Sequence, residues 1–171
     1  MDRQIKIYIG APLFSNAERL YNNLVKYEIE KMFDSSVKIY LPQDNEGIND
    51  KTTYANSEMI YDADNKMLDE ADILVALIDG QTMDVGLASE IGRFAKIAEN
   101  ENNNKKILGL YTDSRQGSYG NKDKLKAVDD IAENQFHYLN LYTVGAIKKN
   151  GTIVKNVEEL LVEIEKIINK L

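Results

Sequence analysis

The stretch Ile73-Leu74-Val75-Ala76-Leu77-Ile78 decides the fold class of this chain. All of its residues are apolar, which is typical of a strand that is covered on both faces of a parallel sheet. Asp79-Gly80 follows as a turn signal, and residues 84–98 then carry apolar side chains at helical spacing. A buried strand, a turn and a helix in this order form the repeating unit of an α/β protein.

The same alternation continues in both directions from this stretch. Short apolar runs predict further strands, at 6–10, 37–41, 106–111 and 138–143. Periodic segments predict further helices, at 16–33, 53–70, 123–133 and 157–170. This order predicts a doubly wound, flavodoxin-like five-stranded parallel sheet flanked by helices. Because no repeat or linker interrupts the 171 residues, we expect 1–171 to form a single domain.

Capping and turn residues mark several boundaries of these elements. Ser15 with a glutamate three residues later predicts a capping box at the start of helix 16–33, and Asn156 is expected to cap the last helix. The polar segment 42–52 is expected to be a loop, and residues 148–151 are expected to form a turn.

The composition excludes several classes of chemistry. The chain has 21 Lys and Arg against 28 Asp and Glu, and this net charge of −7 argues against binding a nucleic-acid polymer. It has no cysteine, and its one histidine, His137, cannot form a metal-binding pair, so no metal site is expected. No apolar run is long enough to span a membrane and no signal peptide precedes the first strand, so a cytoplasmic location is expected. The chemistry must therefore rest on carboxylates, hydroxyls and amides.

The predicted fold indicates where that chemistry should lie. Ligands of open parallel sheets bind outside the carboxyl ends of the strands, at the switch in strand order. Four segments are expected to reach that edge: 8–15, 42–49, 79–90 and 112–120. The first of these contains neither a dinucleotide-binding fingerprint nor a phosphate-binding Walker A loop, so a Rossmann-type site is not expected.

The segment 84–92 carries the most informative carboxylate. Asp84 is suited to cap the helix that begins there. Glu90 lies in the second turn, beside the apolar stripe, where its side chain leans back toward Gly86. The glycine leaves room for a ligand, so Glu90 is a candidate nucleophile or base. The alternative is a surface glutamate that pairs with Arg93.

A second candidate carboxylate precedes the central strand. Asp64 shares a face of the predicted helix with Ile60 and Leu68, and taken alone it is more typical of a surface charge. Two carboxylates in one cleft would suit glycosyl transfer, because one attacks the anomeric carbon while the other manages the proton of the leaving group.

Taken together, these segments resemble nucleoside 2-deoxyribosyltransferases. The resemblance extends over about residues 5–145, and its most specific part is the Asp-x-Gly-x-x-x-Glu-x-Gly pattern at Asp84–Gly92. The matching segments are Ile7–Phe14, Leu41–Asn45, Asp64 eight residues before Asp72–Val75, and Asp84–Gly92.

The resemblance implies a ping-pong exchange of nucleobases with net retention. Glu90 would attack C1′ of a 2′-deoxynucleoside, form a covalent deoxyribosyl-enzyme and then be displaced by an incoming free base. Asp64 would handle the proton on the base, and Tyr8 would position the Glu90 carboxylate. Asp84 would hold a sugar hydroxyl. No cofactor is implied.

Further substrate contacts follow from the same resemblance. Gln43 and Asp44 would lie near the base, with Gly86 and Phe14 also at the substrate. Asn140, with Tyr138 as the alternative, would reach the site of a neighbouring subunit. The resemblance thus implies a homo-oligomer whose site is completed by a neighbour.

Three alternatives to deoxyribosyl transfer remain at this point. Water could replace the acceptor base, which would make the protein a 2′-deoxynucleoside N-glycoside hydrolase. A deoxynucleotide hydrolase is disfavoured, because similar enzymes tend to carry a small hydroxyl residue where Asp84 stands, and an aspartate would repel a 5′-phosphate. A non-enzymatic, receiver-like binding module would need an acidic pair after the first strand, where the chain has Tyr8-Ile9-Gly10-Ala11.

Overall fold

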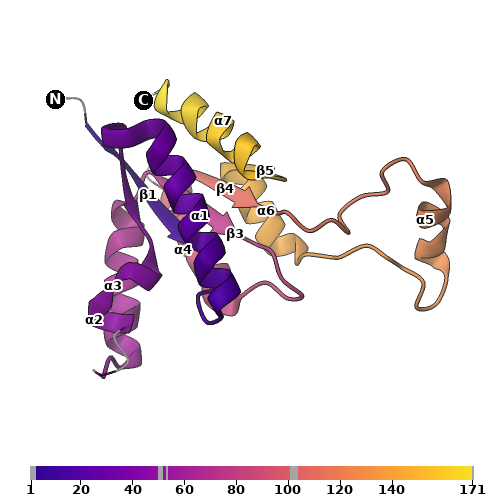
Figure 1. Ribbon diagram of the computed structural model, residues 1–171, viewed down its shortest axis with the longest axis horizontal. Coiled ribbons are helices and arrows are strands. Elements are labelled where there is room, and N and C mark those ends of the chain that lie inside the picture. Colours follow the sequence, from indigo (N-terminus) through magenta and orange to yellow (C-terminus); the bar gives the residue numbers. More distant parts are fainter. Residues whose placement is uncertain (1–2, 50–51, 53, 101–103, 171) are drawn as a thin grey trace.

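A five-stranded parallel sheet forms the centre of the structure, a computed structural model that describes residues 3–49, 52, 54–100 and 104–170 (Figure 1). Its strand order is β2-β1-β3-β4-β5, so the order switches between β1 and β3. Every neighbouring pair is parallel, which confirms the predicted fold class. The strands are β1 Ile5–Gly10, β2 Val37–Tyr40, β3 Ile73–Leu77, β4 Lys106–Leu110 and β5 Gly151–Val154.

Helices cover both faces of this sheet (Figure 1). One face packs against α1 and α7, and the other packs against α3, α4 and α6. The long helices are α1 Asn16–Phe33, α3 Ser57–Glu70, α4 Val85–Asn100, α6 Leu141–Asn150 and α7 Val157–Ile168. None of the helices in the described ranges is long and apolar enough to cross a membrane.

The central strand β3 explains why the sheet is apolar on both sides. Its residues are all buried. Val75 and Leu77 belong to the core beneath α1 and α7, whereas Leu74 and Ala76 belong to the core beneath α3, α4 and α6. Because successive side chains of a strand point to opposite faces, a strand between two helical layers must be apolar throughout.

Side-chain caps define the starts of several helices. Ser15 and Glu18 form the predicted capping box of α1, and Asn156 accepts a hydrogen bond from a backbone N–H in the first turn of α7, as predicted. Asn56 caps α3, which therefore begins at Ser57 rather than at the predicted residue 53, itself outside the described residues. The predicted loop 42–52 contains a 3₁₀ turn (Pro42–Asp44) and the short helix α2 (Glu46–Asn49), while residues 50–51 lie outside the described residues.

The predicted fifth strand at 138–143 is wrong. Asn140 accepts hydrogen bonds from the N–H groups of Tyr142 and Thr143 and so caps α6, which occupies the second half of that segment. The true fifth strand is β5, which begins at Gly151, where a turn was expected. Gly151 allows β5 to approach β4 closely, because a Cβ there would collide with the carbonyl of Ile107.

Residues 112–140 form an arm that projects away from the sheet (Figure 1). The arm carries α5 (Lys122–Lys126), which is shorter than the predicted helix 123–133. Two sets of contacts hold the arm where it leaves the sheet. Asp79 accepts hydrogen bonds from the N–H and hydroxyl of Thr112. The ring nitrogens of His137 lie 2.9 Å from the Tyr111 hydroxyl and 3.0 Å from the Gln81 carbonyl. His137 is therefore a packing residue of the arm.

Candidate active site

A cavity of about 270 Å³ opens at the carboxyl ends of β1 and β3, where the strand order switches. Its walls come from the segments that follow β1, β2 and β3 and from helices α3 and α4. Its apolar lining is Ala11, Leu13, Phe14, Pro42, Ile48, Ile60 and Leu87, its polar lining is Asn49, Asp64, Asp84 and Glu90, and Gly86 completes the wall. The fold thus brings Phe14, Asp64, Asp84, Gly86 and Glu90 together from three separate segments.

Glu90 is held by a buried tyrosine from the neighbouring strand. The hydroxyl of Tyr8 on β1 donates a hydrogen bond of 2.6 Å to Glu90 Oε1, and the Tyr8 ring is fully buried. Burial raises the pKa of Glu90 to about 7, and the negative charges of Asp64 and Asp84 add to this rise, whereas the Tyr8 hydrogen bond opposes it. A carboxyl group with a strongly perturbed pKa in a cleft is typical of a functional site.

Gly10 creates the space that the Glu90 carboxylate occupies. A Cβ at residue 10 would lie 2.9 Å from Glu90 Oε2 and 2.7 Å from Leu87 Cδ1. The sequence pattern points to Gly86 as the glycine that leaves room for a ligand and does not single out Gly10. A Cβ at Gly86 would lie 3.0 Å from Asp84 Oδ1, so that glycine keeps space beside the Asp84 carboxylate instead.

Asp64 is held by a second tyrosine, Tyr40, which sequence reasoning did not single out. The Tyr40 hydroxyl donates a hydrogen bond of 3.1 Å to Asp64 Oδ1. Asn45 donates a hydrogen bond of 3.1 Å to the Tyr40 hydroxyl oxygen. Burial raises the pKa of Asp64, and the hydrogen bond from Tyr40 opposes this rise.

Asp84 marks the edge of the cavity and the start of α4. Its Oδ1 accepts a hydrogen bond of 2.8 Å from the backbone N–H of Leu87, so the predicted cap is confirmed. The arrangement therefore presents three carboxylates to one cavity, two of them each held by a tyrosine hydroxyl. In the described part of the chain, no group of three or more His, Asp or Glu side chains is arranged to hold a metal ion.

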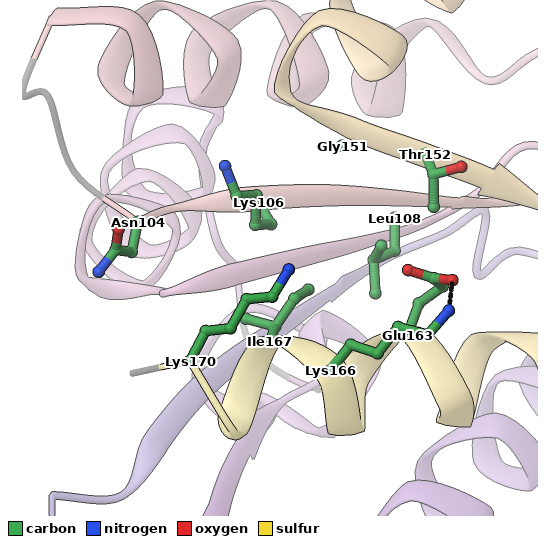
Figure 2. Close-up of a pocket in the computed structure, with 9 residues that line it drawn as sticks. All are labelled: Asn104, Lys106, Leu108, Gly151, Thr152, Glu163, Lys166, Ile167 and Lys170. Atoms are coloured by element: carbon green, nitrogen blue, oxygen red, sulfur yellow. Dashed lines mark hydrogen bonds and ion pairs between the residues drawn. The ribbon is translucent and has the colours of Figure 1, made fainter.

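A second hollow of about 270 Å³ lies at the opposite edge of the sheet, between the amino ends of β4 and β5 and helix α7 (Figure 2). Its charged lining consists of Lys106, Lys166, Lys170 and Glu163. The one carboxylate is engaged, because Glu163 forms an ion pair of 2.7 Å with Lys166. This hollow therefore lacks the paired carboxylates that distinguish the cavity at the carboxyl edge.

The family model described as nucleoside 2-deoxyribosyltransferase matches residues 7–154, which include every residue of the carboxyl-edge cavity. The chain belongs to the nucleoside 2-deoxyribosyltransferase family. Membership of this family of enzymes supports a deoxyribosyltransferase-type activity.

Similar proteins include both characterised transferases and uncharacterised chains. A crystal structure of a conserved protein from Enterococcus faecalis V583 is 48% identical, with a TM-score of 0.87, and the match covers 96% of this chain and 99% of that one. A 2-deoxyribosyltransferase from Bacillus psychrosaccharolyticus has a TM-score of 0.62 at 14% identity, covering 91% and 90% of the two chains. A 2-desoxiribosyltransferase from Leishmania mexicana has a TM-score of 0.58 at 20% identity, covering 96% and 97%. An uncharacterized protein from Ureaplasma parvum serovar 3 is 29% identical over 148 residues, covering 84% of this chain and 92% of that protein. The two transferases confirm the deoxyribosyltransferase fold of this chain.

Three of the substrate contacts suggested by the resemblance to deoxyribosyltransferases do not line the cavity. Gln43 is buried and exchanges side-chain hydrogen bonds with two asparagines of α1, Asn22 and Asn23. Asp44 forms an ion pair of 2.7 Å with Lys26. Asn140 lies where the arm meets α6 and caps that helix. Their contacts with substrate remain predictions.

Proposed function

We propose that this protein transfers the 2-deoxyribosyl group between nucleobases through a covalent intermediate on Glu90. The observation that carries the proposal is the sharing of one cavity by Glu90, held by Tyr8, and Asp64, held by Tyr40. Glycosyl transfer with retention needs this pair of roles, a nucleophile at the anomeric carbon and a group that moves the proton of the leaving base.

In the first half-reaction, Glu90 attacks C1′ of the deoxynucleoside. A C1′–O bond to Glu90 forms while the glycosidic C1′–N bond breaks, and its electron pair goes to the base. Asp64 in its protonated form supplies the proton that the departing base takes up, and the raised pKa of Asp64 supports this role.

The second half-reaction runs the same steps in reverse with a different base. A ring nitrogen of the incoming base attacks C1′, the bond to Glu90 breaks, and its electron pair returns to the carboxylate. The proton of the incoming base passes to Asp64. Two displacements at one carbon give net retention, and neither step requires a metal or cofactor.

Base exchange itself tests this proposal. Incubation with thymidine and adenine should yield deoxyadenosine and thymine, resolved by liquid chromatography. Release of thymine with free deoxyribose alone would instead support the N-glycoside hydrolase, in which water takes the place of the acceptor. Absence of turnover with every 2′-deoxynucleoside would contradict both activities.

The charge of Asp84 should select free nucleosides over 5′-monophosphates, because an anion at the cavity edge repels a phosphate. Serine is also a good helix cap, so Asp84→Ser should keep the cap of α4 while it removes the charge. We expect the ratio of kcat/KM for thymidine 5′-monophosphate to kcat/KM for thymidine to rise by about tenfold or more. Steady-state kinetics measure this ratio, and Asp84→Asn, which also lacks the charge, should shift it in the same direction. An unchanged ratio in both variants would show that Asp84 does not face the 5′ position.

We further propose that the protein works as a homo-oligomer in which the arm of one copy covers the cavity of another. The arm exposes apolar side chains, among them Ile131 at 98% and Tyr138 at 66%, and Phe14 at the mouth of the cavity is 81% exposed. Apolar surfaces of this kind are typical of contacts between subunits. Light scattering coupled to size exclusion should report a mass above the 19.4 kDa of one chain, and Ile131→Asp should lower both the mass and the activity. A monomer with full activity would contradict this arrangement.

A further inference from the structure

Two tyrosines on adjacent strands make equivalent contacts with two of the three carboxylates of the cavity, Glu90 and Asp64. Tyr8 on β1 and Tyr40 on β2 are register partners, and their ring centroids lie 5.3 Å apart. Tyr8 donates its hydroxyl hydrogen to Glu90, whereas Tyr40 donates its hydroxyl hydrogen to Asp64. Each of the two helical carboxylates is thus hydrogen-bonded to a tyrosine on a different strand of the sheet.

Asn45 fixes the direction in which the Tyr40 hydroxyl donates. A phenol has one hydrogen, and the amide of Asn45 donates to its oxygen, so the phenol hydrogen is free to point at Asp64. The other end of the amide is also engaged, because Asn45 Oδ1 accepts a hydrogen bond of 3.1 Å from the N–H of Gly47. Burial raises the pKa of Tyr40 to about 12, so the phenol keeps its hydrogen throughout the neutral range.

The contact with Tyr40 leaves the two oxygens of Asp64 unequal. Oδ1 accepts the Tyr40 hydrogen bond, and the described residues provide no other hydrogen bond to this carboxyl group. Asp64 nevertheless lines the cavity. Oδ2 is therefore the oxygen available to a ligand.

We propose that Tyr40, itself oriented by Asn45, is a positioning residue that occupies Oδ1 of Asp64 and presents Oδ2 to the nucleobase for proton exchange. This inference rests on the proposed transferase function. A hydrogen bond to the carboxylate form also offsets part of the effect of burial, which favours the protonated form. Tyr40 thereby keeps both forms of Asp64 accessible, as a group that donates a proton in one half-reaction and accepts it in the other must be.

The variant Tyr40→Phe tests the proposal, because it keeps the ring beside Tyr8 and removes only the hydroxyl. We expect kcat for base exchange to fall about tenfold with little change in KM for the deoxynucleoside. We expect the titration of the Asp64 carboxyl carbon, followed by NMR, to move upward by about one pH unit. Tyr27→Phe, an exposed position on α1, is the matched control and should leave both readouts unchanged.

Asn45→Ala should reproduce part of these changes, and combining it with Tyr40→Phe should add little, since both variants remove the same hydrogen-bond chain. An unmoved Asp64 titration in Tyr40→Phe would overturn the inference, as would a fall in stability with wild-type kcat. The NMR readout does not depend on turnover. If the Asp64 titration shifts but the protein exchanges no bases, the contact between Tyr40 and Asp64 is upheld and the transferase proposal is rejected. The role of that contact in proton exchange is then rejected as well.

Discussion

Glu90→Gln should lower base exchange by about a thousandfold or more, because an amide cannot act as the nucleophile at C1′. The amide oxygen can still accept the Tyr8 hydrogen bond, so the cavity should keep its shape. Initial rates with thymidine and adenine measure the loss. Mass spectrometry of the acid-quenched wild-type protein incubated with thymidine alone should detect a deoxyribosyl adduct on Glu90, which the variant should lack.

Glu99→Gln provides the matched control, since Glu99 lies on the same helix, outside the cavity, in an ion pair with Lys149. It should retain full activity. Base exchange at the wild-type rate in Glu90→Gln would remove this residue from the mechanism.

The variant Glu90→Gln should be more stable than the wild type above neutral pH. The pKa of Glu90 is raised from 4.5 to about 7 in the folded protein, so the folded state holds this proton more tightly than the unfolded state does. The stability that Glu90 contributes is therefore present below about pH 4.5 and lost as the pH rises through about 7. At pH 8 the lost stability is about 3 kcal/mol, and Glu90→Gln should recover much of it in urea unfolding. A variant that is more stable and yet inactive would separate the loss of chemistry from any loss of folding.

The second large effect is expected in the pH dependence of kcat/KM. Glu90 must be ionised to attack C1′, and its pKa is about 7. Below that value each pH unit lowers the ionised fraction of Glu90 tenfold, so with a deoxynucleoside whose base departs without a proton from Asp64, the rate at pH 5 should be about a hundredfold below the plateau. An ordinary glutamate would hold its activity down to about pH 4.5. Steady-state rates from pH 4.5 to 8.5 measure the position of this acid limb.

Tyr8→Phe sharpens this measurement. The Tyr8 hydrogen bond favours the ionised form of Glu90, so its removal should move the acid limb to higher pH. Tyr27→Phe again serves as the control and should leave the limb in place. A wild-type limb near pH 4.5, or a limb that does not move in Tyr8→Phe, would contradict the environment assigned to Glu90.

The order of strands and helices could largely be predicted because it follows from local patterns. The apolar stretch 73–78, short and followed by a turn signal, is typical of a strand between two layers, and the spacing of apolar residues in 84–98 is typical of a helix. Parallel topology then carries Asp84 and Glu90 to one edge of the sheet without any knowledge of distances. Asp64, which taken alone is typical of a surface charge, is singled out by the resemblance to deoxyribosyltransferases. This is why the main carboxylates of the cavity were identifiable.

The remaining features depend on contacts that no local pattern reveals. The aromatic segment 138–143 has strand-like composition, and only the cap formed by Asn140 turns it into the start of a helix. β5 is four residues long, and its first residue is a glycine that looks like a turn. The hydrogen bond between Tyr40 and Asp64 joins residues 24 apart in sequence, so it is visible only after the chain has folded.

The register of Tyr8 with Tyr40 has a consequence for engineering. Tyr8 and Tyr40, which hold Glu90 and Asp64, lie side by side on two hydrogen-bonded strands, so the sheet itself helps to fix the spacing of the two carboxylates. The part of the cavity wall that would face the nucleobase comes instead from the segments after β1 and β2, which contribute Phe14 and Ile48. Libraries that vary those two positions should alter which bases are accepted while the chemical centre stays in place, so selectivity and rate can be tuned separately.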